Sequence, residues 1–466
     1  MTDHVRPTPE ETRGTQRDDS ASVAGASVTP DDSSGEARTG ATDGARAGGL
    51  SRRGLLALGG GAGLLVGAVG GAAAVASGVF DSASSGAVES LEYPFFADHQ
   101  AGIITPAQDR MHFAAYDLRE DVTREDLIEL LQDWTYAASR MVMGLGVSAR
   151  GAFDGGPYLP PDDTGEAAGL GPFGLTITFG FGRSLFTTED GRDRFGLAGQ
   201  LPEQFTGLPK MVNDFIEPAR SGGDLCIQAC ANDPQVAVHA IRNLTRIGFG
   251  RSTLKWSQLG FGRTSSTSTS QTTPRNLFGQ KDGTNNLKAE EPVRLAENVW
   301  ISEGPAWSRG GSYLVARRIS MLIETWDSVQ LQEQNRVLGR QKATGAPLSG
   351  GDEFSAVDFA TTGADGQPLV DPRSHVARVS PQNNGGIAML RRGYNFVDGN
   401  DAAGRLDAGL FFICFVNAPE RFSAVHTNMA RDDMFVEYLK TTSSSVFVVP
   451  PGIRAGGYVG QALFES

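Results

Sequence analysis

The sequence predicts an α+β fold made of two similar halves, each an antiparallel sheet covered on one face by helices. Strand-like and helical runs follow one another in the order strand, helix, strand, strand, helix, strand, and this order is expected twice along the chain. A Ser-, Thr-, Gly- and Asn-rich connection over residues 251–300 separates the two series. A sheet with helices on one face is a common way for such a series to bury its apolar residues.

The first series starts with a strand over residues 108–119 and a helix over residues 122–143. Apolar residues in the second segment recur at the spacing of one helical face, and Thr123 with Asp126 can cap its start. The other elements of this half are strands over residues 174–181 and 223–231 and a helix over residues 234–247.

The second series repeats this pattern after the long connection. Its elements are a strand over residues 311–321, a helix over 322–340, a strand over 410–416, a helix over 422–439 and a strand over 446–449. We interpret residues 251–300 as irregular, and loops of this length in compact proteins usually carry function or are mobile.

Length, composition and charge indicate a globular protein with a sizeable core. The chain has 466 residues, of which 39% are hydrophobic and 20% are charged. A formal net charge of −13 argues against a nucleic-acid partner, because no basic stripe is present that would neutralise phosphates.

The three cysteines are expected to be buried thiols. Cys226 and Cys230 share one face of a predicted strand and would lie about 13 Å apart, too far for a disulfide or a shared metal. With Cys414 they form an odd, sparse set, which is no disulfide framework.

Residues 1–76 predict an export leader. Residues 1–50 are too polar to bury enough surface to fold. Residues 51–76 place Arg52 and Arg53 before an uncharged Gly/Ala/Leu/Val run, which is typical of a twin-arginine signal. We therefore expect export to the periplasm, the cell wall or the extracellular space. The uncharged run is also long enough to remain as a membrane tether.

Histidine is a candidate ligand for a metal or a cofactor. None of the six histidines forms the spaced pairs that mark a zinc site. His239 lies inside an amphipathic helix and is expected to be structural. His375 lies in the polar segment from Asp371 to Pro381, and haem needs only one protein imidazole. From the residues alone, His375 is either a surface residue or a ligand.

Two further segments combine charged residues with glycine. Residues 278–284 place Asp282 between glycines, which indicates either a surface turn or a tight loop against a close partner. Residues 389–394 place Arg391 and Arg392 after an apolar approach. A guanidinium buried there would need an anion beside it.

In this order the segments resemble the dye-decolorizing (DyP-type) peroxidase family, and within it the exported, iron-uptake-associated deferrochelatase/peroxidase branch. The motif Gly279-x-x-Asp282-Gly283 matches the family's signature. The supporting blocks are Trp307 to Ile319, Gly222 to Gln228 with Asp233 to Val236, and Leu390 to Tyr394. The resemblance covers residues 94–464.

The resemblance implies two ferredoxin-like halves, residues 94–275 and 276–466, with one non-covalent haem b per chain in the C-terminal half. It makes His375 the axial ligand of the iron and places Asp282 and Arg391 on the peroxide side. The other residues that it implies at the haem are Gly283, Thr284, Asn285, Ser380, Pro381 and Gln382, with Arg309 or Arg378 as candidate propionate partners. The sequence Ser380-Pro381-Gln382 departs from the more basic stretch expected there.

The reaction that the resemblance implies is reduction of hydrogen peroxide with oxidation of dyes, phenolic or porphyrin-type donors. Asp282 would move a proton between the peroxide oxygens, and Arg391 would stabilise the charge that develops as the O–O bond breaks. A carboxylate shuttle favours acid conditions. A carboxylate behind His375 would make the ligand more donating. The candidates for that carboxylate are Asp432, Asp433 and Glu437.

The alternative function is release of iron from haem within an uptake system, because the same residues would serve both tasks. The expected partners are hydrogen peroxide and an organic electron donor, with other iron-uptake components for the alternative and no nucleic acid. We also expect a homo-oligomer, a dimer or larger.

Overall fold

The computed structural model describes residues 87–465. The predicted leader, residues 1–50, and the predicted signal, residues 51–76, lie outside the described residues. Within the described range no helix is both long enough and apolar enough to cross a membrane.

The first half of the described chain combines four antiparallel strands with two long helices. Its elements are β1 (Arg110–Leu118), α2 (Arg124–Met141), β2 (Thr176–Gly182), β3 (Leu225–Ala231), α3 (Pro234–Ile247) and β4 (Ser252–Arg263). The strands lie side by side in the order β2-β3-β1-β4. Helix α3 packs on β1 and β3, and α2 packs on α3.

The predicted start signals of both helices are confirmed. Thr123 accepts a hydrogen bond from the Asp126 amide, and the Asp126 carboxylate accepts one from the Thr123 amide, which is a capping box. Asp233 accepts hydrogen bonds from two amides in the first turn of α3, where Pro234 needs no hydrogen-bond acceptor.

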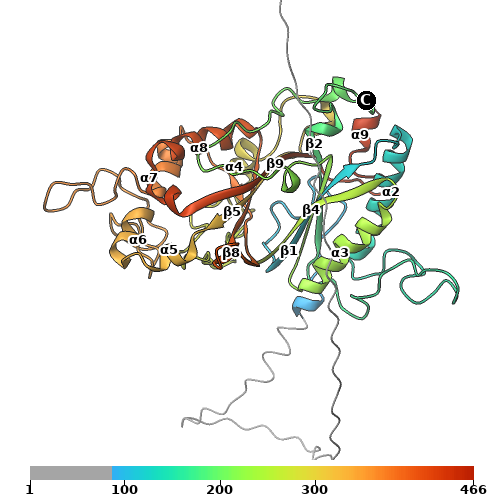
Figure 1. Ribbon diagram of the computed structural model, residues 1–466, viewed down its shortest axis with the longest axis horizontal. Helices are drawn as coiled ribbons and strands as arrows, with labels where there is room; N and C mark the ends of the chain where they lie inside the picture. The colour runs from blue at the N-terminus through green and yellow to red at the C-terminus, as the bar shows by residue number, and fades with distance from the viewer. Residues whose placement is uncertain (1–86, 466) are drawn as a thin grey trace, which may run out of the picture. The chain divides into compact units, whose positions relative to one another are not determined.

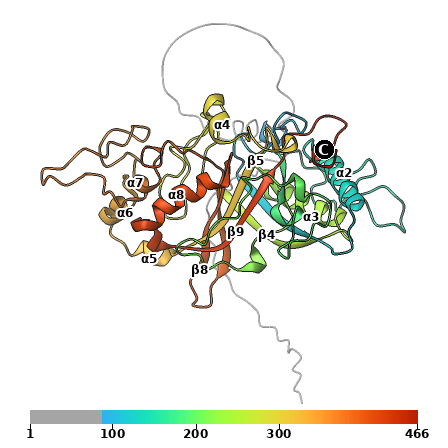
Figure 2. The ribbon, with the colours of Figure 1, turned by 90° about the horizontal axis from the view of Figure 1, so that it is seen from above.

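Three helices of the second half lie in one long segment between its first two strands. Its strands are β5 (Ser312–Met321), β6 (Leu390–Arg391), β7 (Tyr394–Asn400), β8 (Leu406–Val416) and β9 (Leu439–Val449). Its helices are α4 (Pro292–Asn298), α5 (Ile323–Asp327), α6 (Leu331–Leu338), α7 (His375–Val379), α8 (Pro419–Asp432) and α9 (Gln461–Phe464). In both views α5 to α8 lie on the opposite side of the strands from α2 and α3 (Figure 1, Figure 2).

The strands of both halves form one sheet, whereas the sequence predicts a separate sheet in each half. The order in this nine-stranded sheet of the described residues is β5-β9-β2-β3-β1-β4-β7-β8-β6. Because β8 also pairs with β5, the sheet closes on itself into a barrel-like ring. An unpaired strand edge leaves backbone groups without partners, and pairing β2 with β9 and β4 with β7 removes such edges. The predicted α+β class with antiparallel strands is confirmed.

Three segments differ from their predicted structure. The helix predicted over residues 422–439 ends at Asp432, because Asp433 has an extended backbone (φ −63°, ψ 116°), and a 3-10 turn over Met434–Tyr438 then leads into β9. Residues 251–300 contain β4 and α4, although we expected an irregular connection. The alternation of buried and exposed residues in β4 uses serine, glutamine and glycine, so it lacks the apolar contrast that identifies a strand. The helix predicted over residues 322–340 is two helices, because Gln330 has an extended backbone (φ −58°, ψ 142°). Gln334 of α6 donates to the carbonyl groups of Trp326 and Val329 across this break.

The cysteines lie as predicted. Cys226 and Cys230 are buried on β3, Cys414 is buried on β8, and all three are free thiols. Burial raises the pKa of the Cys414 thiol well above its usual range, so this group stays protonated.

We predict that Trp134→Ala lowers the free energy of unfolding by about 3–5 kcal/mol, because it leaves a cavity in the core. Trp134 is fully buried, and its indole N–H donates to the Leu244 carbonyl of α3 at 2.8 Å. Tyr136→Ala on the same helix is the control, since Tyr136 is 54% exposed and its loss should cost less than about 1 kcal/mol. Urea unfolding followed by circular dichroism measures both changes, and equal losses would contradict the prediction.

Candidate functional site

His375 is the first residue of α7 and is held by a carboxylate at the end of α8. Its Nδ1 lies 2.8 Å from Oδ2 of Asp433. The Asp433 side chain is fully buried, and its Oδ1 accepts a hydrogen bond from the Phe435 amide at 2.9 Å. Because an ionised carboxylate only accepts hydrogen bonds, Nδ1 carries a proton and the neutral ring keeps its lone pair on Nε2.

The other ring nitrogen of His375 is available to a ligand. The side chain is 26% exposed, and Nε2 has no hydrogen-bond partner within residues 87–465. The ring packs against Phe435 with a centroid distance of 4.9 Å. On the α6 side, Gly339 approaches so closely that a Cβ there would lie 2.4 Å from Cγ1 of Val376. The imidazole is therefore fixed in orientation while one of its nitrogens stays free.

The structure distinguishes the three carboxylates considered behind His375. Asp433 makes the hydrogen bond described above. Asp432 instead pairs with Arg378 at 2.6 Å, and Glu437 is exposed to solvent. Asp433 ends α8 and also caps the following turn, so its position is set by the backbone on both sides.

Asp282 lies in a loop that is organised by one asparagine. Nδ2 of Asn276 donates to Oδ2 of Asp282 at 3.2 Å, and Oδ1 of Asn276 accepts hydrogen bonds from the amides of Phe278 and Gln280. The Asp282 amide donates to the Pro274 carbonyl at 3.0 Å. Asn276 therefore holds the loop and the carboxylate together.

Gly283 is required by the geometry of this loop. Its φ is +84°, and a Cβ built on it would lie 2.8 Å from Cα of Ser265. Both the left-handed backbone and the close approach exclude a larger residue at the end of the Gly-x-x-Asp-Gly motif.

Arg391 faces Asp282 from the short strand β6. Its Nη1 donates to Oδ1 of Asp282 at 2.9 Å. Asn286 fixes its backbone, because Oδ1 of Asn286 accepts from the Arg391 amide at 2.7 Å and Nδ2 donates to the Arg391 carbonyl at 2.8 Å. Within the part of the chain that the structure describes, Nε and Nη2 of Arg391 have no acceptor. Two guanidinium donors thus remain free beside a carboxylate.

Arg392 points to the opposite side of the backbone, as neighbouring residues on a strand do. It is fully buried, and its guanidinium donates to the carbonyl of Thr105 at 2.6 Å and to the side chain of Gln108. The structure therefore brings Arg391, and not Arg392, to Asp282.

An aromatic cluster connects the loop of Asp282 with the segment of His375. Phe278 of the loop stacks on Trp326 at a centroid distance of 4.6 Å and contacts Phe435 at 5.5 Å. Phe435 in turn contacts the His375 ring. The cluster belongs to a small hydrophobic core of its own. The two candidate catalytic segments are thus packed against the same aromatic side chains.

Thr284 and Asn285 follow the motif with different surroundings. Oγ1 of Thr284 donates to Oε1 of Glu353 at 3.2 Å, and Lys281 forms an ion pair with the same carboxylate. Burial acts in the opposite direction, but these contacts hold the pKa of Glu353 below its usual range. Asn285 is exposed. Glu353 therefore connects the loop of Asp282 to the long segment between β5 and β6.

The remaining predicted residues lie after α7 or far along the chain. Ser380 ends α7 and accepts a hydrogen bond from the Gln382 amide at 3.2 Å, Pro381 is half-buried and Gln382 is exposed. Arg309 is exposed, and its Nε donates to the Gly304 carbonyl at 3.0 Å.

Positive charge collects near Arg391. Nζ of Lys288 donates to the Ser266 carbonyl at 2.7 Å. Burial lowers the pKa of Lys288 and the nearby charge of Arg391 lowers it further, although the carboxylates of Glu291, Glu290 and Glu353 act in the opposite direction. A negatively charged ligand beside these two cations would relieve their repulsion.

Sequence reasoning missed Asn276, Asn286 and Glu353. Our prediction selected Asn285, whereas the next residue, Asn286, contacts Arg391. No periodicity in a loop separates an asparagine that holds a neighbour from one that faces solvent. The only sequence signal that Asn276 and Asn286 share is that both lie within six residues of Asp282.

Comparison with known proteins identifies relatives over most of the chain. Residues 100–262 match the family model described as Dyp-type peroxidase, N-terminal, and residues 273–454 match the one described as Dyp-type peroxidase, C-terminal. Deferrochelatase from Escherichia coli (strain K12) is 33% identical over 378 residues, which are 80% of this chain and 87% of that protein.

Solved structures of similar proteins have the same fold. Ferric DtpA from Streptomyces lividans is 38% identical with a TM-score of 0.74, covering 82% of this chain and 99% of that one. The DyP-type peroxidase from Cellulomonas bogoriensis is 33% identical with a TM-score of 0.71, covering 81% of this chain and 99% of that one.

We predict that Gly283→Ala destabilises the protein by about 1–3 kcal/mol more than Gly386→Ala. Both glycines have a φ above +80°, but a Cβ at Gly386 would meet no atom within 4 Å. The comparison therefore isolates the contact with Ser265 from the backbone penalty that both variants share. Thermal and urea unfolding measure the difference. Equal destabilisation by the two variants would show that the close approach has no energetic consequence.

Proposed function

The chain belongs to the Dyp-type peroxidase family, and from this premise we propose that His375 would bind a haem iron while Asp282 and Arg391 would act on the peroxide. As a family member the protein is a haem-dependent peroxidase. The observation that supports the proposed residues best is the His375–Asp433 pair. One imidazole nitrogen is fixed on a buried carboxylate, and the other has no partner within the described chain.

The side chains present fit a haem group. A neutral imidazole with a free Nε2 is a suitable iron ligand. Nε of Arg378, one turn after His375, is buried and has no hydrogen-bond partner within the described residues, which suits an anionic group such as a propionate. The free donors of Arg391 and the nearby Lys288 add further positive charge.

When bound, a haem would supply the iron and the two electrons needed to reduce peroxide, and an organic donor would replace these electrons. Asp433 accepts a hydrogen bond from Nδ1 of His375 and thereby makes Nε2 a stronger electron donor. Because Phe435 also donates to Asp433, the carboxylate cannot turn away from the ring.

On the peroxide side, Asp282 accepts the proton of one peroxide oxygen and delivers it to the other, which leaves as water. Asn276 and Arg391 each hold one of its oxygens, so the carboxylate is oriented before peroxide arrives. The guanidinium of Arg391 offsets the negative charge that develops on the departing oxygen. A carboxylate shuttle favours acid conditions, as expected from the sequence.

Several finer features belong to the same proposal. We propose that the haem is a non-covalent haem b, with one group per chain in the C-terminal half, and that the chain forms a homo-oligomer. Each half is interpreted as a ferredoxin-like unit, supported by the order β4-β1-β3-β2 in the first half and β9-β5-β8-β7 in the second. Arg52 and Arg53 support export by the twin-arginine route.

The second candidate function is release of iron from haem, and the relative named deferrochelatase favours it. The two functions differ in their products. Incubating the purified protein with haem and following porphyrin fluorescence detects loss of iron from an intact ring. Accumulation of metal-free porphyrin without added peroxide would favour iron release, whereas peroxide-dependent dye oxidation without porphyrin would favour the peroxidase as the main activity.

We predict that His375→Ala abolishes the Soret band of the haem-loaded protein, because the iron loses its protein ligand. Asp433→Asn should keep the band but shift the iron reduction potential upwards, since an amide cannot accept the Nδ1 proton as strongly. Absorption spectroscopy and spectroelectrochemistry measure the two effects. Glu437→Gln, which removes an exposed carboxylate of the same segment, is the matched control and should leave the potential unchanged. A full Soret band with unchanged ligation in His375→Ala would overturn the assignment.

We predict that Asp282→Asn and Arg391→Leu each lower kcat/KM for peroxide by at least about 100-fold at acid pH, because proton transfer and charge stabilisation are lost. Dye oxidation under excess donor measures the rate, and the Soret band confirms that haem is bound. Asp365→Asn, at an exposed loop position, is the control. Unchanged activity in Asp282→Asn would exclude Asp282 as the proton carrier.

A further inference from the structure

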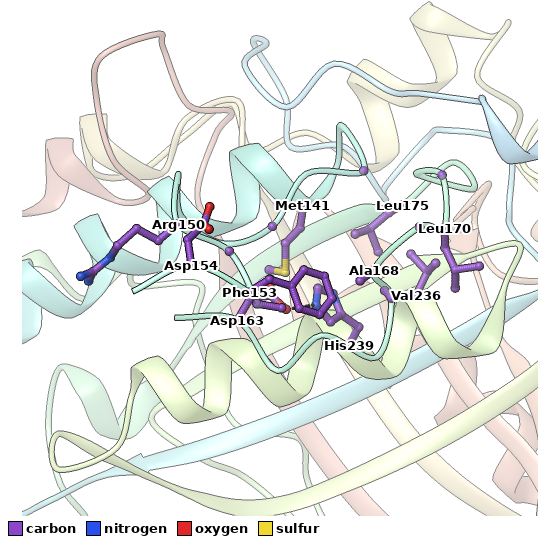
Figure 3. Close-up of a pocket in the computed structure, with 17 residues that line it drawn as sticks. Met141, Arg150, Phe153, Asp154, Asp163, Ala168, Leu170, Leu175, Val236 and His239 are labelled. Carbon is purple, nitrogen blue, oxygen red and sulfur yellow. Dashed lines mark hydrogen bonds and ion pairs between the residues drawn. The ribbon is translucent and has the colours of Figure 1, made fainter. Parts of the chain in front are cut away.

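A cavity of about 250 Å³ lies in the first half of the chain, between the end of α2, the start of α3 and the glycine-rich loops that follow α2. Its residues include the apolar side chains Met141, Phe153, Leu170, Leu175 and Val236, together with His239 (Figure 3). None of its residues belongs to the His375–Asp282 site. Helices α2 and α3 also lie across the strands from α7 (Figure 1).

His239 faces this cavity with one nitrogen already engaged. Its Nε2 lies 2.8 Å from Oδ1 of Asp163, which also accepts a hydrogen bond from the Gly165 amide at 2.7 Å. Oδ2 of Asp163 accepts one from the Val147 amide at 2.9 Å. The side chains of His239 and Asp163 are 8% and 3% exposed. Because an ionised carboxylate only accepts hydrogen bonds, Nε2 is the donor to Asp163, and in the neutral form of the ring Nδ1 is an acceptor.

Nδ1 of His239 has no hydrogen-bond partner in the described part of the chain. The side chain is more than nine-tenths buried and lines the cavity, so a ligand in the cavity can reach it. An acceptor that borders the cavity and has no protein partner gains a hydrogen bond from a ligand that carries one donor. A His–Asp pair that served only to fill the core would not need space beside its free nitrogen.

The charges around the cavity favour a neutral ligand. Asp154 and Asp163 line it, and the one cation among the described lining residues, Arg150, is held by both oxygens of Asp162 at 2.9 and 3.0 Å. An anionic ligand would therefore meet carboxylates without a free guanidinium.

The size and walls of the cavity favour a single aromatic ring. An apolar protein cavity of about 150 Å³ is large enough for benzene, so this one has room for a substituted ring. The thioether of Met141 makes favourable contacts with aromatic rings. A ring with one hydroxyl combines an apolar body with the single donor that His239 lacks.

We propose that this cavity binds a neutral monocyclic phenol, whose hydroxyl donates to Nδ1 of His239 and whose ring lies against Met141, Leu175 and Val236. The proposal does not depend on the peroxidase reaction, and binding requires no peroxide. If phenol binding is not observed, the proposed peroxidase function is unaffected, and the reverse also holds.

The test is binding of 4-fluorophenol to the haem-loaded protein, followed by fluorine NMR without peroxide. We expect saturable binding that is about tenfold tighter than binding of 4-fluoroanisole, which lacks the donor, since one buried hydrogen bond contributes about 1 kcal/mol or more. Nuclear Overhauser contacts from the ligand to a ¹³C-labelled Met141 methyl group, assigned with Met141→Leu, locate it. Absence of saturable binding, or equal binding of the two compounds, would overturn the proposal.

Variants separate this cavity from any other phenol site. Val236→Phe fills the cavity and should abolish binding, whereas Val238→Phe, on the same helix but outside the lining, should preserve it. His239→Gln should remove the preference for 4-fluorophenol. If the Val236→Phe variant does not fold, the Overhauser contacts between the ligand and Met141 in the unmodified protein still show whether the ligand lies in this cavity. Ligand contacts elsewhere, or undiminished binding in a folded Val236→Phe variant, would contradict the proposal.

Discussion

The pairing of β8 with its neighbours is the constraint on which both sides of the candidate site depend. This strand pairs with β5 to close the sheet and with β7 and β6 on its other edge. In the β6 pairing Arg391 lies opposite Cys414, which fixes the register of the arginine. The chain then leaves β8 into α8, which ends at Asp433, the partner of His375. One strand therefore sets the positions of Arg391 and of the carboxylate behind His375.

The polar side chains of the candidate site are also held in place by hydrogen bonds to one another. Asp282 is held by Asn276 and Arg391, and Arg391 is held through its backbone by Asn286. Each of these hydrogen bonds is made before any substrate binds, so little reorganisation remains for the reaction. The aromatic contacts among Phe278, Trp326 and Phe435 add rigidity, because a packed core resists small shifts of the loops that cover it.

The sequence predicted the elements that have strong periodicity or caps. Helix α2 begins after Thr123 and α3 begins after Asp233, because their start signals are local and the structure uses them unchanged. Strand β4 was not predicted, because its buried positions include the polar residue Gln258. The hydrogen-bond partners of Gln258 are Arg318 and Asp398, which lie far along the chain. Closure of the sheet was not predicted either. The pairing of β5 with β8 joins segments about a hundred residues apart, so it leaves no local pattern in the sequence.

For the site, the sequence could indicate residue types but could not choose among neighbours. Asp432, Asp433 and Glu437 were equivalent as candidates, and only the end of α8 decides which of them reaches His375. Arg391 and Arg392 were separated by family resemblance alone, whereas the strand geometry gives the physical reason that they face opposite sides.

The two histidine–aspartate pairs show how surroundings determine what one chemical unit can bind. In both, a buried carboxylate accepts a hydrogen bond from one imidazole nitrogen, and the other nitrogen has no partner within the described residues. His375 is 26% exposed and lies one turn from Arg378, whose buried Nε lacks an acceptor. His239 is 8% exposed among apolar side chains and carboxylates. The first environment suits an iron centre with anionic groups, and the second suits an uncharged ring with one hydroxyl. The imidazole alone does not determine the ligand, because the exposure of the ring and the side chains around its free nitrogen differ between the two sites.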